Sequence, residues 1–450
     1  MKTSYEREQE IYKEKTPQSE QTYEMAKQYM PGGDTRTIAF FQPYPPTIER
    51  AEGAYLFDLD GNKYIDFVNN YTSMIHGHAH PYIVEKVREA LPLGTAYAAS
   101  IPEQTTLAKI LCERIPSMQK VRFCNSGTEA TMFAIRAARA FTKKTAIIKM
   151  EGGYHGTHDL VEYSTKPLIT EKSHQDPWKP IPDCAGLSEN VAKDIFIAPF
   201  NNARAVEEIL LQKQDEVAAI LVEPVMGVAG VIAPEPGFLE QLRKLANQYH
   251  VLLIFDEVQT LRLSTGGAQK KFGVIPDLTA IAKIIGGGFP IGAFGGKDDI
   301  MKGFDPYQEH AIPHGGTFNG NKMSMVAGIA AMELLTENVI QCMKKLSELL
   351  ELKINEAIQK NEIPVSISRV GSMLNLHFTE KVPTNYAETA NQYGDLMKVL
   401  HLKMINNGIF IAPRGMMNLS TVMTAEDIES TATAFSKAFE EIAELFEKVN

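Results

Sequence analysis

The stretch VLLIFDEVQ, residues 251–259, begins with five apolar residues that are followed by two acids, the first of which is Asp256. An unbroken apolar run of this kind is typical of a central strand that is covered on both faces of a sheet. Over about 75–330, short apolar runs alternate with helical stretches, which predicts an α/β fold with a mostly parallel sheet. The other candidate strands are KVRFC (120–124), AIIKM (146–150) and AAILV (218–222).

Polar or glycine-rich residues follow each candidate strand directly. In open α/β sheets, ligands bind outside the carboxyl ends of the strands. We therefore expect these four segments to form one site. Their sequences are NSGTEA (125–130), EGGYHG (151–156), EPVMG (223–227) and DEVQ (256–259).

Asp256 stands at the end of a buried strand, where an unpaired carboxylate is costly. One interpretation is a solvated or capping acid. The other is a carboxylate that faces a protonated ring nitrogen, which is the pyridinium partner that pyridoxal 5′-phosphate (PLP) requires. A cation of that kind would lower the cost of burying the acid.

Lys283 lies among apolar residues and glycines in TAIAKIIGGGFPIGAFGG (279–296). The lysine is either a snorkelling side chain or an amine whose pKa falls on burial, ready to form an imine. Gly286, Gly287 and Gly288 match no phosphate-loop pattern, so we interpret them as room for backbone close to a ligand.

NSGTEA lies between a candidate strand and the helical stretch TEATMFAIRAARAF (128–141). Small residues with free backbone N–H groups at a helix N-terminus suit a phosphate, although the pattern alone is also that of a simple helix cap. Tyr154 and His155 in GGYHG are ordinary loop residues, or else the tyrosine stacks on a flat ring.

The whole chain has 450 residues, of which 44% are hydrophobic and 22% charged, an ordinary globular composition. Its formal charge of -10 argues against binding nucleic acid or an anionic membrane through a general positive field. Four scattered cysteines without a CxxC pair favour reduced thiols over a disulfide scaffold or a zinc site. With no signal-peptide pattern and no apolar run near ~20 residues, we expect a soluble, cytoplasmic protein without a membrane partner.

The two ends of the chain differ from its middle. Residues 1–30 predict a polar helical arm, and residues 53–67 predict a hairpin that turns at Asp60-Gly61. A final helix opens at Thr424, and the stretch 156–190 has the composition of a long, functional loop. The final helix places apolar residues on one face, namely Ile428, Phe435, Phe439, Ile442 and Phe446.

Taken together, NSGTEATM, EGGYHG, VEPV, DEVQT, PDLTAIAKIIGGGFPIGAFGG and GGTFNGN resemble the class III aminotransferases. The best match is the branch of glutamate-1-semialdehyde aminomutase and the β-amino-acid transaminases, over about 31–420. The resemblance implies PLP fold type I and a homodimer with shared active sites. It also implies an N-terminal arm with part of a small domain (1–74), a large PLP-binding domain (75–330) and a C-terminal small domain (331–450).

The resemblance assigns roles residue by residue. Lys283 matches the Schiff-base lysine that also moves the proton, and Asp256 matches the pyridinium partner. Tyr154 matches the aromatic that stacks on the ring, and Val258 matches the residue on the other face. Thr317 matches the threonine that reaches the phosphate from the neighbouring subunit. The remaining matches are the phosphate turn Ser126, Gly127 and Thr128, the active-site acid Glu223, and Gln259 near the ring hydroxyl, where this branch often has Met.

The substrate residues separate the two members of the branch. The aminomutase pattern GGVNSPVRAF has a late arginine, whereas this chain has Ala39 there and an earlier Arg36. Arg36, Tyr71 and Arg414 resemble the β-amino-acid transaminases, in which an arginine holds the substrate carboxylate. We therefore expect an enzyme that transfers an amino group from a β-amino or related ω-amino compound to 2-oxoglutarate or pyruvate.

Three other functions remain open at this point. They are glutamate-1-semialdehyde 2,1-aminomutase, amination of a β-ketoacyl group on a carrier protein, and PLP binding without turnover. Intact Lys283, Asp256 and Tyr154 argue against the last. The preferred donor, its enantiomer, the acceptor and the pathway are not determined by the sequence.

Overall fold

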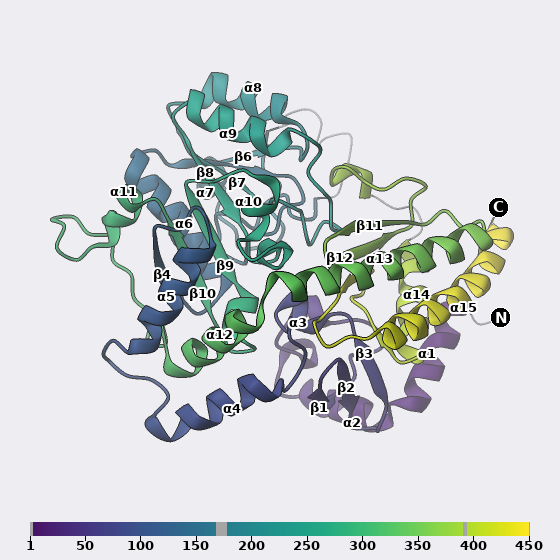
Figure 1. The fold of residues 1–450 in the computed structure, drawn as a ribbon. Coiled ribbons are helices and arrows are strands. Elements are labelled where there is room, and N and C mark those ends of the chain that lie inside the picture. Colours follow the sequence, from purple (N-terminus) through teal and green to yellow (C-terminus); the bar gives the residue numbers. More distant parts are fainter. Residues whose placement is uncertain (1–2, 168–177, 390–393, 450) are drawn as a thin grey trace. The chain divides into compact units, whose positions relative to one another are not determined.

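The computed structural model describes residues 3–167, 178–389 and 394–449, with side chains up to residue 445 (Figure 1). The chain packs into two compact units. The larger unit comprises Pro81–Ile340 and Pro383–Ala390, and the smaller unit comprises Met1–His80, Gln341–Val382 and Asn391–Asn450.

The larger unit is built on a seven-stranded sheet in the order β4-β10-β9-β8-β7-β5-β6. Strand β10 is antiparallel to both of its neighbours, and the other pairs are parallel. The predicted α/β fold with a mostly parallel sheet is therefore confirmed, as are the four predicted strands. The strands are β4 (Lys120–Cys124), β5 (Ala146–Met150), β6 (Ile195–Ala198), β7 (Val217–Val222), β8 (Leu252–Asp256), β9 (Leu278–Ala282) and β10 (Gly292–Gly296).

Apolar helices cover both faces of this sheet. Leu253 and Phe255 of β8 pack in one cluster with α8 (Ala203–Lys213) and α9 (Phe238–Gln248). The alternate residues Leu252 and Ile254 pack in a second cluster with α6 (Gly127–Thr142), so successive side chains face opposite helices. Because both faces are covered, the carboxyl ends of the strands are the part of the sheet that is left to carry polar groups.

Shorter elements complete the larger unit. Gly287 (φ +56) follows η6 and lies against the backbone carbonyl of Ala327 in α12, where a Cβ would collide. That it also leaves room for backbone close to a ligand stays a prediction. The elements are α4 (Pro81–Ala90), η3 (Leu91–Leu93), α5 (Pro102–Arg114), α7 (Glu189–Ala192), η5 (Thr260–Leu263), α10 (Gly267–Phe272), η6 (Lys283–Gly286), α11 (Asp298–Met301), η7 (Lys302–Phe304), α12 (Lys322–Leu334) and η8 (Ala387–Thr389).

The smaller unit contains two sheets, in the orders β1-β2-β3-β13 and β11-β12-β14. The predicted hairpin is confirmed: Tyr55 pairs with Ile65 across an antiparallel β2–β3, and Gly61 at the turn has φ +85. The strands are β1 (Ile48–Glu52), β2 (Tyr55–Asp58), β3 (Lys63–Asp66), β11 (Ser366–Val370), β12 (Met373–His377), β13 (Ile409–Phe410) and β14 (Met416–Asn418).

Helices from both chain ends pack on these sheets. The predicted final helix is α15, whose capping residue Thr424 accepts from Asp427 N. Four of its five predicted face residues are buried, and the side chain of Phe446 lies outside the described residues. The helices are α1 (Ser4–Lys15), α2 (Pro17–Ala26), η1 (Pro31–Gly33), η2 (Thr37–Ala39), α3 (Asn69–Thr72), α13 (Glu337–Lys360, which begins in the larger unit), α14 (Gly394–Asn406) and α15 (Ala425–Val449).

Two further expectations from the sequence concern the long loop and membrane-spanning helices. Residues 168–177, the middle of the predicted loop 156–190, lie outside the described residues. Within the described part of the chain, no single helix is long and apolar enough to cross a membrane, although α12 and α13 together meet that test across a bend.

Candidate active site

Three neighbouring parallel strands, β7, β8 and β9, end at the same edge of the large sheet. Phe255 pairs with Val222 on one side, and Asp256 pairs with Ala280 on the other. This register brings Glu223, Asp256 and Lys283 to one edge. The sequence predicted this for Glu223 and Asp256, whereas the strand before Lys283 was not among the predicted ones. We call these three residues, together with Tyr154, the strand-end cluster.

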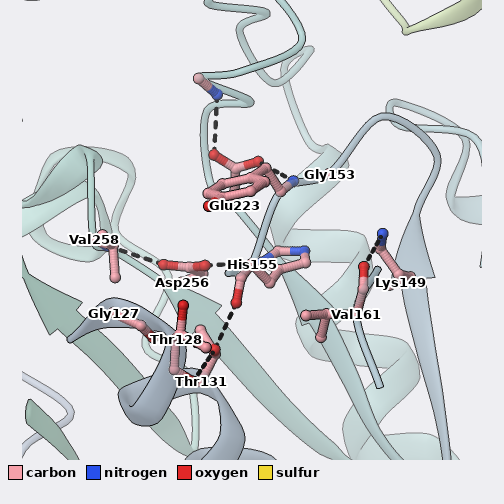
Figure 2. Close-up of polar contacts among 12 residues, drawn as sticks. Gly127, Thr128, Thr131, Lys149, Gly153, His155, Val161, Glu223, Asp256 and Val258 are labelled. Carbon is pink, nitrogen blue, oxygen red and sulfur yellow. Dashed lines mark hydrogen bonds and ion pairs between the residues drawn. The ribbon is translucent and has the colours of Figure 1, made fainter. Parts of the chain in front are cut away.

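Asp256 is a buried acid of the strand-end cluster, with 4% of its surface exposed. Its Oδ1 accepts from Val258 N at 3.0 Å, and its Oδ2 lies 2.9 Å from His155 Nδ1 (Figure 2). Burial lowers the pKa of His155 more than Asp256 raises it, so the ring is neutral and its Nδ1–H donates to the carboxylate. These two donors orient Asp256 without neutralising its charge.

Lys283 begins η6 directly after β9, and its backbone is in the left-handed region with φ +55. Such a conformation costs a non-glycine residue of order 1–3 kcal/mol and persists only where neighbouring structure enforces it. Here Ala282, the preceding residue, is held in the sheet by its pairing with Gly292 of β10. This backbone conformation turns the chain out of the strand direction at Lys283.

The N-terminus of α6 packs against the residues that follow β8 and β9. Ser126 caps the helix, with its Oγ accepting from Glu129 N at 3.1 Å. A Cβ on Gly127 would lie 3.1 Å from Val258 Cγ1 and 3.6 Å from Ala282 Cβ, so glycine permits this close approach. The turn Ser126, Gly127 and Thr128 thus meets the strand-end cluster, and its free N–H groups suit an anion.

Glu223 holds the loop that carries Tyr154. Its Oε1 accepts from Tyr154 N at 2.9 Å and its Oε2 accepts from Gly227 N at 3.0 Å (Figure 2). Burial and the nearby Asp256 raise the pKa of Glu223 to about 8, although Lys283 opposes the shift. The loop also packs on the α6 turn, because a Cβ on Gly156 would lie 2.6 Å from Thr128 Cα.

The two remaining predicted cofactor residues differ in burial. Gln259 is buried, and its side chain fills the space that a Cβ on Gly227 would occupy. Thr317 is exposed, two residues before Asn319, whose Oδ1 accepts from Asn125 Nδ2 at 2.7 Å. Its reach toward a neighbouring subunit stays a prediction.

Two buried residues that support this site were not predicted to do so from the sequence. One is His155, which the sequence offered as a loop residue. The other is Lys149 of β5, whose Nζ donates to Val161 O at 2.9 Å and to Tyr163 O (Figure 2). Burial lowers the pKa of Lys149 to about 8. A lysine inside the apolar run AIIKM was the available signal, because a cation at such a position requires several acceptors.

The three predicted substrate residues meet within the smaller unit, and we call Arg36, Tyr71 and Arg414 the arginine corner. Arg414 Cζ lies 5.9 Å from the centroid of the Tyr71 ring. Arg36 Nη1 donates to Asn70 Oδ1 at 2.8 Å, and Tyr71 OH donates to Ile38 O at 2.6 Å. Burial raises the pKa of Tyr71, and both arginines oppose the rise, so both positive charges act at this ring.

A strained turn presents the arginine corner. Asn69, Asn70, Tyr71 and Thr72 are four consecutive residues with φ of 50, 45, 53 and 75°. A left-handed turn of non-glycine residues costs roughly 1–2 kcal/mol per residue, and less for asparagine. Arg36, Asn70 and Tyr71 also line a cavity of about 240 Å³ within this unit. Two of the four strained residues, Asn70 and Tyr71, thus line this cavity.

Comparison with known proteins gives one matching family and relatives of two kinds. The family model for aminotransferase class-III matches residues 41–442. A curated relative named glutamate-1-semialdehyde 2,1-aminomutase, from Methanocaldococcus jannaschii, is 38% identical over 431 residues, which cover 95% of this chain and 99% of the relative.

Two solved structures represent the second kind. An omega-transaminase from Sphaerobacter thermophilus has a TM-score of 0.90 and 39% identity, covering 95% of this chain and 98% of that one. A beta-phenylalanine aminotransferase from Variovorax paradoxus has a TM-score of 0.87 and 34% identity, covering 96% of each chain. The similarity spans nearly the whole chain in both kinds of relative.

Proposed function

We propose, from the premise that this chain belongs to the class III aminotransferases, that it transfers an amino group from a β-amino acid to a 2-oxo acid. The family is PLP-dependent and has fold type I. The single observation that carries the choice of substrate is the arginine corner, where two guanidinium groups act at Tyr71.

The strand-end cluster fits PLP by the chemistry of its groups. A helix N-terminus without a side chain at Gly127 suits a phosphate. Asp256 is a buried carboxylate whose two donors leave its charge in place, which suits a protonated ring nitrogen. Lys283 supplies the amine at the same sheet edge. When bound, PLP supplies an electron sink for the bond that is cleaved at the substrate carbon.

Each residue of the site then has a defined task. Asp256 keeps the proton on the ring nitrogen, and His155 orients Asp256. Lys283 Nζ takes the proton from the carbon that bears the substrate amino group, which is general base catalysis. Glu223 fixes the backbone of Tyr154, so that the aromatic ring has one orientation. Val258 packs against Gly127 and would close the site on the ring face opposite Tyr154.

We assign the substrate carboxylate to the arginine corner. A planar guanidinium binds a carboxylate through two parallel hydrogen bonds, which fixes orientation as well as charge. Asn70 holds one nitrogen of Arg36, so less side-chain freedom remains to be lost on binding. Arg414 provides a second cation for an enzyme that must accept an amino acid and a keto acid in turn.

Glutamate-1-semialdehyde aminomutase is the second candidate. The observation that favours it is the 38% identity to the relative of that name. Against it stands the position of the arginine, since this chain has Ala39 where the aminomutase pattern has its late arginine. The beta-phenylalanine aminotransferase supports the first candidate at 34% identity.

The decisive experiment follows the absorbance of PLP on the purified protein while amino donors are added singly. We expect 3-amino acids to convert it to the pyridoxamine form, and 2-oxoglutarate or pyruvate to reverse the conversion. Glutamate-1-semialdehyde supplied alone is the comparison substrate. Its conversion to 5-aminolevulinate, without reaction of any 3-amino acid, would establish the aminomutase instead.

Arg36→Ala tests the carboxylate assignment. Loss of a bidentate charged contact weakens binding by about 1.5–3 kcal/mol, which is roughly 10- to 100-fold in KM for the 3-amino acid. PLP affinity should not change. The matched control is Arg7→Ala, an exposed arginine of α1, which should change neither quantity. Equal KM values in the two variants would show that Arg36 does not bind the substrate carboxylate.

We also propose a homodimer. Around Thr317 the larger unit exposes two large aromatic side chains, Tyr307 at 94% and Phe318 at 60% of their surface. Exposed aromatic residues of this kind are enriched at protein interfaces. Light scattering of the purified protein should give twice the mass of one chain, 49.9 kDa. The monomer mass at micromolar concentration would contradict the proposal.

A further inference from the structure

The segment Pro383–Ala390 packs with the larger unit, although the chain before it and after it belongs to the smaller unit. Within the segment, Thr384 N donates to Glu388 Oε2 at 2.8 Å, and Glu388 N donates to Asn385 Oδ1 at 3.1 Å. Hydrogen bonds to the Glu388 carboxylate from the Thr384 N–H, the Thr384 hydroxyl and the Asn385 side chain lower the pKa of Glu388. The segment is therefore a closed turn with its own hydrogen bonds, which limits the freedom it loses on docking.

Asn201 anchors the segment to the large sheet. Its Nδ2 donates to Thr384 O at 2.7 Å and to Ala233 O at 3.0 Å. Its Oδ1 accepts from Glu235 N at 2.8 Å. One amide thus ties the segment to the residues after β6 and to the loop before α9. The contact is specific, because it uses both ends of the amide.

Tyr386 is the residue of the segment that reaches the site loop. Its ring lies on Gly152, which has φ +79, and a Cβ there would be 2.6 Å from Tyr386 Cβ and Cδ2. Its OH donates to Pro167 O at 3.3 Å. Burial raises the pKa of Tyr386 to about 12, so the hydroxyl stays neutral. The ring therefore packs directly on the backbone of Gly152, because glycine has no side chain between the two.

Gly152 is two residues before Tyr154, in a loop that is held at every position around it. Gly152 N donates to Ser164 O at 2.7 Å, and Gly153 N donates to Met150 O at 3.0 Å. Tyr154 N is held by Glu223, and the His155 ring is held by Asp256. Tyr386 adds a packing contact on Gly152, a glycine whose backbone would otherwise have a wide range of φ and ψ.

We propose that Tyr386 is a positioning residue: by packing on Gly152 it sets the orientation of Tyr154 toward the cofactor ring. The inference rests on the proposed role of Tyr154. A displacement of about 1 Å caused by a residue away from the chemistry can cost about 100-fold in rate. The effect of Tyr386 is thus expected in the geometry of the bound cofactor and in turnover, rather than in the chemistry of Lys283.

Tyr386→Ala is the first test, with PLP bound to the otherwise intact protein. We expect a changed visible circular dichroism band of bound PLP and a fall of about 10- to 100-fold in kcat/KM for a 3-amino acid. Tyr386→Phe keeps the ring and should restore both properties. The control is Tyr249→Ala, which removes another partly buried tyrosine packed on the same apolar cluster. It should lower the melting temperature and leave the circular dichroism band unchanged.

A double variant separates packing on Gly152 from general destabilisation. Gly152→Ala alone adds a methyl group that collides with the Tyr386 ring and strains φ, so it should change the band strongly. In Gly152→Ala/Tyr386→Ala the collision is gone. The change in the band that Gly152→Ala adds to Tyr386→Ala should therefore be smaller than the change it causes in the unmodified protein. Equal changes in both backgrounds would overturn the inference.

Two outcomes separate this inference from the function on which it rests. If the unmodified protein binds no PLP, or binds PLP but uses no amino donor, the proposed function fails first. If the protein binds PLP and turns over, while Tyr386→Ala and Tyr249→Ala behave alike, only the positioning role of Tyr386 is overturned.

Discussion

Asp256 and Arg36 are the charged residues with the two main proposed binding roles, yet the protein holds them in different ways. Asp256 ends a regular strand, is 4% exposed and takes two hydrogen bonds, from Val258 N and His155. Arg36 is exposed and is steadied by one hydrogen bond from its guanidinium to Asn70, a residue of a strained left-handed turn. The strand-end cluster is therefore set by the sheet, and the arginine corner is set by loops.

The difference explains how one family contains relatives with two activities. Strand ends inside a packed sheet cannot shift without disturbing both covering layers, so the cofactor chemistry is held constant. Loop residues can change without that cost, and binding residues are accordingly concentrated on loops. The relatives named aminomutase and transaminase match this chain equally well, at 38% and 39% identity. Overall identity therefore does not distinguish the two activities.

The largest expected effect is that of a substitution in the strand-end cluster. Lys283→Ala removes the group that moves the proton, and we expect the rate of amino transfer to fall by at least about 10⁴-fold. The measurement is single-turnover absorbance after the addition of PLP and a 3-amino acid. Lys270→Ala, which changes an exposed lysine of α10, is the control and should keep the full rate. A modest loss in Lys283→Ala would exclude its role as the base.

The second prediction ranks two residues within the same cluster. Asp256→Asn removes the charge that holds the ring proton, and we expect a loss of about 10²- to 10⁴-fold in kcat. His155→Asn removes only a hydrogen bond to that charge, worth about 1.5–3 kcal/mol, or roughly 10- to 100-fold. Steady-state kinetics of both variants checks the order. A larger loss in His155→Asn would mean that the histidine does more than orient Asp256.

The third prediction concerns pH and the cofactor-free protein. The pKa of Glu223 is raised to about 8, so folding favours its protonated form; this stabilisation is complete below pH 4.5 and is lost as pH rises through 8. Between pH 6 and 8.5 the loss is about 2 kcal/mol. Glu223→Gln cannot ionise and should lack this part of the pH dependence, as measured by urea denaturation. Lys149 has the opposite sign, because its pKa is lowered to about 8, so the two proteins must be compared rather than one followed alone.

Parallel slopes for the unmodified protein and Glu223→Gln would show that Glu223 titrates normally in the folded chain. Its hydrogen bonds to Tyr154 N and Gly227 N would then be those of an ionised carboxylate at all pH values tested. The strand-end cluster would then hold one more negative charge, so its difference in charge from the arginine corner would be larger.

The smallest expected effect is at the arginine corner. Asn70→Gly relieves the left-handed φ of 45° but removes the acceptor for Arg36 Nη1. We expect the free energy of unfolding to change by less than about 1 kcal/mol, since relief of strain and added chain entropy oppose each other. KM for a 3-amino acid should rise severalfold, by about the value of one net hydrogen bond, ~1 kcal/mol. An unchanged KM would indicate that Arg36 needs no support from Asn70.

Much of the strand-end cluster was predictable, because each of its residues sits beside a recognisable local pattern. Tyr154, Glu223 and Asp256 each follow a predicted strand, so local sequence places these three at one sheet edge. The strand before Lys283 was not among the predicted ones. His155 and Lys149 were not predictable as site residues. Their contacts join residues 101 and 12 positions apart, and no spacing in the sequence signals such pairs.

Two glycines show what the sequence left undetermined. Gly127 packs against Val258 and Gly287 packs against the backbone carbonyl of Ala327, and neither neighbour was evident from the sequence. A glycine reports only that space is limited or that φ is unusual. Which neighbour limits the space is a property of the folded chain.

By itself, the sequence determined the family, the α/β fold, and the strand ends that offer an acid, an amine and a helix N-terminus, since these follow from apolar periodicity and short motifs. Only the tertiary structure decided that His155 supports Asp256, that a left-handed turn presents Tyr71, and that Tyr386 lies on Gly152. The physical reason is that these features depend on contacts between distant segments, whose geometry exists only after the hydrophobic layers have packed.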